Sequence, residues 1–229
     1  MDDVAARIAF LQHSSTDVPG LLGDLADDLG LDVSVHRPDQ GRGGLPRPGS
    51  FDLLVVMGSI KSVCDSTVPW VGPERSLVAG AVDNGVPVLG VCFGGQLLAQ
   101  VLGGTVGPAS STELGWTTVR TIDPGGIGAG PWLNWHEDAF TCPPGAELLA
   151  TTDIAPQAYV KGIHTGVQFH PEVTADVVHS WIEEARDQDG IDDAHVTALL
   201  AGFDQQGRGP EKQTEALFKG FLSRAGALV

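Results

Sequence analysis

Short apolar runs alternate with longer segments of helical periodicity in the first half of the chain. Four runs rich in valine, isoleucine and leucine predict β-strands at residues 7–12, 32–38, 51–59 and 87–92. Two of them are continuously apolar, which is typical of strands that helices cover on both faces. Between the strands, residues 20–30 and 73–85 carry apolar side chains three and four positions apart and end in glycine, which predicts two helices.

This alternation predicts an α/β fold with an open, mostly parallel, twisted sheet and helices on both faces. After Gly104 the chain changes to shorter, partly alternating segments joined by glycine and proline, which predict a small antiparallel extension of the sheet. Three C-terminal helices are expected from Thr174 onward. We therefore expect a single domain over residues 1–229, with an α/β catalytic core at 1–173 and a helical C-terminal part at 174–229.

Composition narrows the class of protein. A chain of 229 residues with 42% hydrophobic content supports one sizeable core. Its formal net charge of -16 argues against a nucleic-acid surface, which needs clustered lysine and arginine. Three cysteines without disulfide or zinc spacing indicate a reducing compartment, and the N-terminus shows neither a signal sequence nor a membrane span. The cytoplasm is therefore expected, with no membrane partner and no metal.

The first candidate for chemistry is Cys92, in a G-x-C-x-G pattern between a predicted strand and a predicted helix. In a nucleophile elbow the sharp turn requires residues without side chains on either side of the nucleophile, and the next backbone N–H points towards the developing oxyanion. The start of the helix also favours the thiolate. The same pattern fits an ordinary buried cysteine at a tight turn, so the motif alone leaves both interpretations open.

A cysteine nucleophile needs a base, and the base needs an orienting group. His170 ends a strand-like run, and Glu172 follows two residues later, so a two-residue period would place both side chains on one face. The alternative is a histidine at a strand end and a glutamate placed by the helix dipole. Five other histidines have no informative neighbourhood and are expected on the surface or satisfied in the core: His13, His36, His164, His179 and His195.

Several segments together resemble a known family. They are "PVLGVCFGGQLLAQVLGG", "GVQFHPE", "DLLVVMGSIKSVCDSTVPWV", "ELGWTTV" and "NWHEDAFTCPPGAELLATTD". Together they resemble the class I, or triad-type, glutamine amidotransferases, and most closely stand-alone proteins similar to the amidotransferase domain of GMP synthase. The first two segments are highly specific in combination, and the others support them. The resemblance implies a flavodoxin-like fold.

The resemblance also implies roles for the catalytic residues. Cys92 would attack the side-chain amide of glutamine, His170 would be the general base and acid, and Glu172 would orient His170. The reaction would pass through a thioester and give glutamate and ammonia. Backbone N–H groups of Ser59 and Phe93 would hold the oxyanion.

The resemblance further assigns Gly58, Gln96, Trp135 and Glu137 to substrate binding. Two departures from the family pattern bear on this assignment. Ser59 replaces the second glycine of a Gly-Gly-Pro turn and would tolerate a positive φ less well, which places pre-formation of the oxyanion hole in doubt. Glu137 replaces a glycine of many relatives, and its side chain either turns outward or changes which γ-glutamyl compound fits.

Two tryptophans and two cysteines are expected to be structural: Trp70 and Trp116 as packing anchors, and Cys64 and Cys142 as inert thiols. The sequence shows no nucleotide-binding motif, and no cofactor is expected. L-glutamine is the expected substrate, and a separate synthetase subunit is the expected acceptor of the ammonia. Two alternatives stay open: a free-standing γ-glutamyl hydrolase or peptidase with the same triad, and a non-catalytic regulatory subunit.

Overall fold

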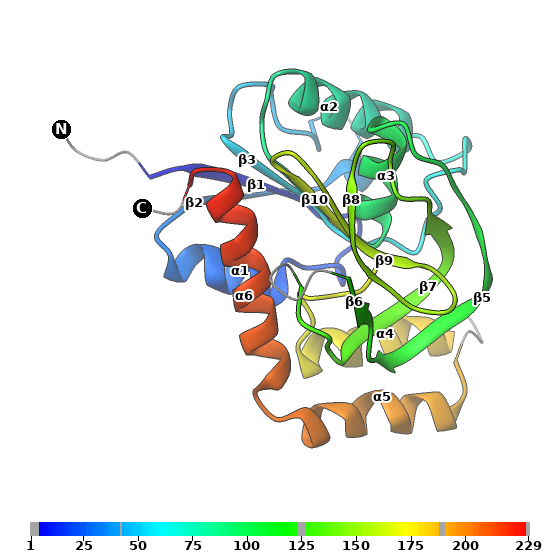
Figure 1. Ribbon diagram of the computed structural model, residues 1–229. Helices are drawn as coiled ribbons and strands as arrows, with labels where there is room; N and C mark the ends of the chain where they lie inside the picture. The colour runs from blue at the N-terminus through cyan, green and yellow to red at the C-terminus, as the bar shows by residue number, and fades with distance from the viewer. Residues whose placement is uncertain (1–4, 42, 123–126, 188–190, 228–229) are drawn as a thin grey trace.

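The structure, a computed structural model, describes residues 5–41, 43–122, 127–187 and 191–227. An eight-stranded sheet runs through its centre in the order β2-β1-β3-β4-β10-β9-β8-β6 (Figure 1). In that order the strands are Asp32–His36, Arg7–Leu11, Leu53–Val56, Val88–Val91, His164–Val167, Pro156–Lys161, Glu147–Thr151 and Arg120–Thr121. The first five are parallel and the last three antiparallel, as the sequence predicts for a mostly parallel sheet.

Helices cover both faces of this sheet (Figure 1). They are α1 (Gly20–Asp28) and α6 (Gly209–Arg224) on one face, and α2 (Val71–Asp83) and α3 (Phe93–Val101) on the other. Alternate residues of β1 face opposite ways, so Phe10 belongs to the core shared with Phe218 of α6, whereas Leu11 belongs to the core shared with Leu97 of α3. Because helices with apolar faces pack on both sides of the sheet, the central strands β3 and β4 are buried at every position.

A second, two-stranded antiparallel sheet pairs β5 (Val106–Thr117) with β7 (Trp132–Phe140). The antiparallel part of the fold is therefore divided: β6, β8 and β9 continue the main sheet, and β5 and β7 pair apart from it. The small sheet separates because it has a core of its own, in which Leu133 packs with α4 (Ala175–Asp187) and α5 (Asp193–Gln206). Trp116 anchors α5, since its indole N–H donates to the Leu199 carbonyl at 2.9 Å.

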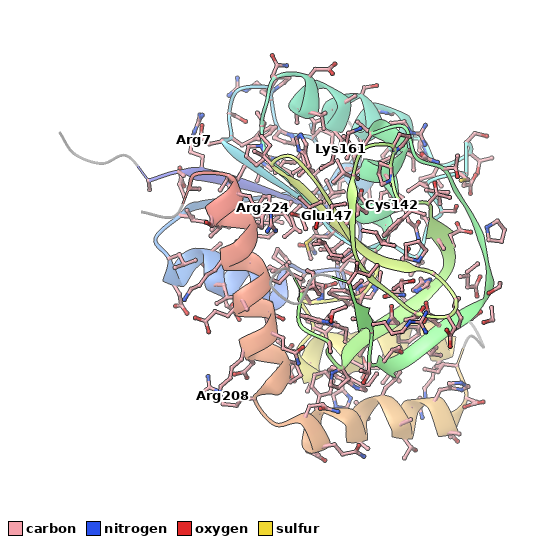
Figure 2. All side chains as sticks on the ribbon, in the orientation of Figure 1. Arg7, Cys142, Glu147, Lys161, Arg208 and Arg224 are labelled. Atoms are coloured by element: carbon pink, nitrogen blue, oxygen red, sulfur yellow. The ribbon has the colours of Figure 1, made fainter. Side chains whose placement is uncertain are left out.

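The C-terminal helix α6 returns to the main sheet. Figure 2 shows Arg224 near its end, where the guanidinium donates to the Thr165 hydroxyl of β10 at 3.1 Å. Earlier in α6, the Thr214 hydroxyl donates to the Pro171 carbonyl at 2.6 Å. The helix therefore supports β10 and the turn that follows it. A short 3-10 helix, η1 (Pro38–Gln40), follows β2.

The described residues contain neither a membrane-spanning helix nor a cluster of metal ligands. None of the described helices is both long and apolar enough to cross a lipid bilayer. Across the same described ranges, no three metal-ligating side chains come together in a cluster that could hold an ion.

Candidate active site

The candidate site lies at the carboxyl ends of parallel strands. His13 follows β1, Gly58 follows β3, Cys92 follows β4, and His170 lies three residues after β10. Because the carboxyl ends of neighbouring parallel strands meet at one edge of a sheet, segments distant in sequence converge there. A cavity of about 870 Å³ opens at this edge. Seven of the nine residues expected at the site line it: Ser59, Cys92, Phe93, Gln96, Trp135, Glu137 and His170.

Cys92 occupies a strained turn between β4 and α3. Its φ of 50° and ψ of -108° make it the one non-glycine residue with positive φ among those the structure describes. The neighbouring glycines are required by close approach: a Cβ at Gly94 would lie 2.0 Å from the Val56 carbonyl oxygen, and one at Gly90 would lie 2.3 Å from the Gly94 oxygen. The helix α3 begins at Phe93, so its positive end lies beside the sulfur.

His170 is paired with Glu172 through an imidazole Nδ1 to carboxylate distance of 2.7 Å. The two-residue strand period is not the cause, because β10 ends at Val167 and the pair lies in an isolated bridge and a turn. The backbone N–H of His170 donates to the Leu133 carbonyl at 2.8 Å, and this bond fixes the start of the turn.

The surroundings of His170 favour its charged form. Burial alone lowers the pKa of His170, but the Glu172 carboxylate and the neighbouring Cys92 sulfur together raise it well above its ordinary value. The Trp181 ring of α4 packs edge-on against the imidazole, with the centroids 4.8 Å apart. The imidazole therefore has one anchored nitrogen, one packed side and the cysteine beside it.

A buried amide near the sulfur was missed by the sequence analysis. The Gln168 side chain is fully buried and donates towards the Cys92 sulfur at 3.7 Å. The available signal was a polar residue inside the otherwise apolar run before His170. Gln96, one helical turn beyond the cysteine, donates to the Asp138 carbonyl at 3.0 Å and so reaches the opposite wall of the cavity.

The Gly58–Ser59 segment approaches both the histidine and the cysteine. A Cβ on Gly58 would lie 2.9 Å from His170 Cε1 and 3.7 Å from Cys92 Cβ, so only glycine fits without displacement. Ser59 does not adopt a positive φ, which removes the backbone objection to a serine at this position. The loop conformation is accessible to an L-residue, and the Ser59 hydroxyl accepts a bond from the Lys61 N–H at 3.1 Å.

A second buried histidine–glutamate pair lies behind this segment. His13 Nε2 is 2.9 Å from a Glu74 oxygen, its Nδ1 is 2.7 Å from the Gly58 carbonyl oxygen, and both side chains are fully buried. The His13 ring stacks on Trp70 at 4.8 Å and contacts the Phe93 ring at 4.8 Å. Sequence reasoning missed this pair because its members come from the segment after β1 and from α2, far apart in the chain.

The outer wall of the cavity combines aromatic and acidic side chains. Trp135 and Trp181 pack edge to face at 6.2 Å, and Glu137 is exposed. Asp17 is buried, and its Oδ2 has no hydrogen-bond partner among the described residues. Burial raises the pKa of Asp17 to about 6, although the charges of His13 and His170 act to lower it.

Residues 25–184 match the model of the family described as glutamine amidotransferase class-I. A GMP synthase (glutamine-hydrolyzing) of Parafrankia sp. (strain EAN1pec) is 38% identical over 136 residues, which is 56% of this chain and 24% of that protein. The chain thus spans about a quarter of the length of the curated relatives it matches first.

Solved structures share the fold over nearly the whole chain. A glutamine amido transferase from Methylobacillus flagellatus superposes with a TM-score of 0.84 and 26% identity, covering 96% of this chain and 95% of that one. A glutamine amidotransferase from Thermotoga maritima superposes with a TM-score of 0.86 over 96% of this chain and 99% of that one. At 24% identity, the latter similarity concerns the fold alone.

Proposed function

Because the chain belongs to the class I glutamine amidotransferase family, we propose that it hydrolyses the side-chain amide of glutamine through Cys92, His170 and Glu172. The observation that carries the proposal is the strained elbow at Cys92 beside the anchored His170–Glu172 pair. A backbone held at positive φ on a non-glycine residue costs free energy and is found where function requires it. Here it lifts the sulfur into the cavity next to an imidazole.

The first half of the proposed reaction breaks the C–N bond. The Cys92 thiolate attacks the γ-carbonyl carbon of glutamine and forms a tetrahedral intermediate with a negative oxygen. His170, held protonated by Glu172, donates its proton to the nitrogen as the C–N bond breaks. Ammonia leaves, and a γ-glutamyl thioester remains on Cys92.

The second half uses His170 in the reverse sense. The now neutral imidazole accepts a proton from water as the water oxygen attacks the thioester carbonyl. Collapse of the second tetrahedral intermediate expels the Cys92 thiolate and releases glutamate, and the proton stays on His170. The cycle consumes one water and one glutamine and returns the thiolate–imidazolium pair.

The oxyanion of both intermediates would accept bonds from the N–H groups of Phe93 and Ser59. Phe93 is the first residue of α3, so its N–H has no partner within the helix. Both residues line the cavity beside Cys92. Gln96, Trp135 and Glu137 also line it and are the proposed contacts of the substrate, with Gly58 behind them.

The fate of the ammonia follows the family pattern. The named curated relatives are glutamine-hydrolysing GMP synthases of which this chain matches only a part. We infer that a separate synthetase subunit accepts the ammonia. A second candidate function is hydrolysis of a larger γ-glutamyl compound, which the cavity of about 870 Å³ favours because it is of the size that holds a drug-sized ligand.

The test is release of ammonia and glutamate from glutamine by the purified chain, beside Cys92→Ala and Cys64→Ala. Cys64 lines the same cavity but bonds to no histidine among the described residues, so it is the matched control. We expect turnover to vanish in Cys92→Ala and to persist in Cys64→Ala. Turnover of a γ-glutamyl dipeptide without turnover of glutamine would favour the second function, and full activity of Cys92→Ala would overturn both.

A further inference from the structure

We propose that His13 and Glu74 are positioning residues that hold the Gly58–Ser59 peptide in the orientation in which its N–H serves the oxyanion. The inference rests on the proposed function above and extends it to two side chains outside the cavity. Neither His13 nor Glu74 lines the cavity, so any effect they have on the reaction must pass through the residues they hold.

His13 fixes the orientation of the peptide plane between Gly58 and Ser59. In a trans peptide the C=O and the following N–H point in opposite directions. His13 Nδ1 binds the Gly58 carbonyl oxygen at 2.7 Å, so the Ser59 N–H is directed away from His13. A Cβ built on Gly58 would meet His170 and Cys92, so this peptide lies close to both catalytic side chains. Among the described residues the Ser59 N–H has no acceptor, which leaves it available for a developing oxyanion.

Both bonds of His13 depend on the protonation of its ring nitrogens. A carbonyl oxygen and a carboxylate are both acceptors, so each nitrogen of His13 must carry a proton to satisfy them. Burial lowers the pKa of His13, but the Glu74 carboxylate outweighs this effect and the net shift is upward. Asp17 is the other charged group whose field acts on His13, and it acts in the same direction as Glu74. In the imidazolium form, Nδ1–H donates to the Gly58 carbonyl and Nε2–H to Glu74 at the same time.

His13 also packs against Phe93, whose backbone N–H is the second proposed oxyanion donor. The His13 ring contacts the Phe93 ring at 4.8 Å, and Trp70 packs on both of these rings at 4.8 Å and 5.4 Å. One imidazole therefore contacts Phe93 and the carbonyl of the Gly58–Ser59 peptide, the two places that supply the proposed oxyanion donors. If the peptide rotated, its carbonyl would turn towards the cavity and the Ser59 donor would be lost.

A matched pair of double variants tests this inference. His13→Asn places an amide nitrogen where Nδ1 lies, whereas His13→Leu has the same shape without the donor. Each is combined with Glu74→Gln, so that neither leaves a buried charge unpaired. Relative to H13N/E74Q, we expect H13L/E74Q to lose about 10²-fold in kcat for glutamine with KM nearly unchanged, since the oxyanion bond forms only in the intermediate.

A second readout separates positioning from general disruption. Alkylation of Cys92 by iodoacetamide displaces iodide at a saturated carbon and forms no oxyanion. The two double variants should therefore alkylate at equal rates while their kcat values differ. A single variant, His13→Gln, keeps a donor for Glu74 but withdraws the one at Gly58, so it provides the same test if H13L/E74Q does not fold.

Each outcome is decisive. Equal kcat in H13N/E74Q and H13L/E74Q, or full activity of His13→Gln, overturns the positioning role while leaving the proposed function intact. Parallel loss of alkylation and turnover also overturns it, because the thiolate and not the oxyanion would then be affected. A wild-type protein that alkylates but turns over neither glutamine nor a γ-glutamyl dipeptide contradicts the proposed function itself, and the inference falls with it.

Discussion

Two of the buried histidine–glutamate pairs among the described residues lie at the same edge of the sheet and differ in how they are built. His170 and Glu172 are two residues apart, and His170 faces the cavity with one nitrogen bound to the carboxylate. His13 and Glu74 are 61 residues apart, fully shielded from solvent, with both nitrogens bound. A histidine with a nitrogen available to substrate can move protons, whereas one with both nitrogens occupied can only hold its partners in place.

The largest expected effect comes from breaking the first pair at the imidazole. In His170→Gln the proton donor for the leaving nitrogen is lost, and we expect kcat for glutamine to fall by at least about 10³-fold. H13N/E74Q is the control, because it alters the other imidazole, keeps a donor for Gly58 and leaves no buried charge unpaired. Steady-state ammonia release measures both. A residual rate above a tenth of wild type in His170→Gln would contradict its assigned role.

Breaking the same pair at the carboxylate should have a smaller effect that also depends on pH. Glu172→Gln removes the charge that orients His170 and raises its pKa, so we expect a loss of about 10²-fold or more in kcat. The pKa of His170 should fall, and the alkaline limb of the pH profile of kcat/KM should move to lower pH as the imidazolium loses its proton earlier. An unchanged limb would mean that Glu172 does not set the charge of His170.

How far the sequence predicts the site depends on the same contrast between near and distant partners. The elbow at Cys92 and the His170–Glu172 turn each lie within a few consecutive residues, so motif and spacing identify them. His13, Glu74 and Trp181 come from three elements that only the fold brings together. In sequence, Glu74 is an ordinary polar residue early in a helix, and nothing in its neighbourhood indicates burial.

The predictability of the fold shows the same contrast between partners that are near and distant in sequence. The parallel strands and their covering helices are local patterns of apolar residues, and the sequence predicts them nearly to their ends. Whether a later strand joins the main sheet or a second one depends on what packs against it. Leu133 and Trp116 pack against α4 and α5, which are distant in sequence, so the separate β5–β7 sheet could not be predicted from the strands themselves.

A third carboxylate, Asp17, lies within the field of both imidazoles and sharpens the comparison. Its pKa is raised from 3.8 to about 6 in the folded state, so the folded protein binds more protons than the unfolded chain between these values. Stability therefore falls as pH rises through that window and stays lower above it. We expect Asp17→Asn to raise the free energy of unfolding by about 2–3 kcal/mol at pH 7.5.

The same substitution should bring no gain below about pH 3, where Asp17 is protonated in both states. Urea denaturation at the two pH values measures the difference, and Asp153→Asn, at an exposed position, is the control. An equal gain at both pH values would show that the charge of Asp17 is not the cause. Activity is the second readout, because a loss of turnover in Asp17→Asn would mean that this carboxylate supports the proton transfers of His170.

The smallest expected effect comes from removing only the charge of the second pair. In Glu74→Gln the amide can donate to Nε2 of a neutral His13, whose Nδ1–H still donates to Gly58, so kcat should stay within about threefold of wild type.

The stability of Glu74→Gln relative to wild type should instead change with pH. The pKa of His13 is raised in the folded wild type, so its contribution is complete below about pH 6.5 and is lost as pH rises through the folded value. The stability difference from Glu74→Gln, about 1 kcal/mol at pH 6, should therefore shrink in urea titrations at higher pH. A kcat loss as large as that of Glu172→Gln would mean that the charge of the second pair, and not its bond to Gly58, supports the reaction.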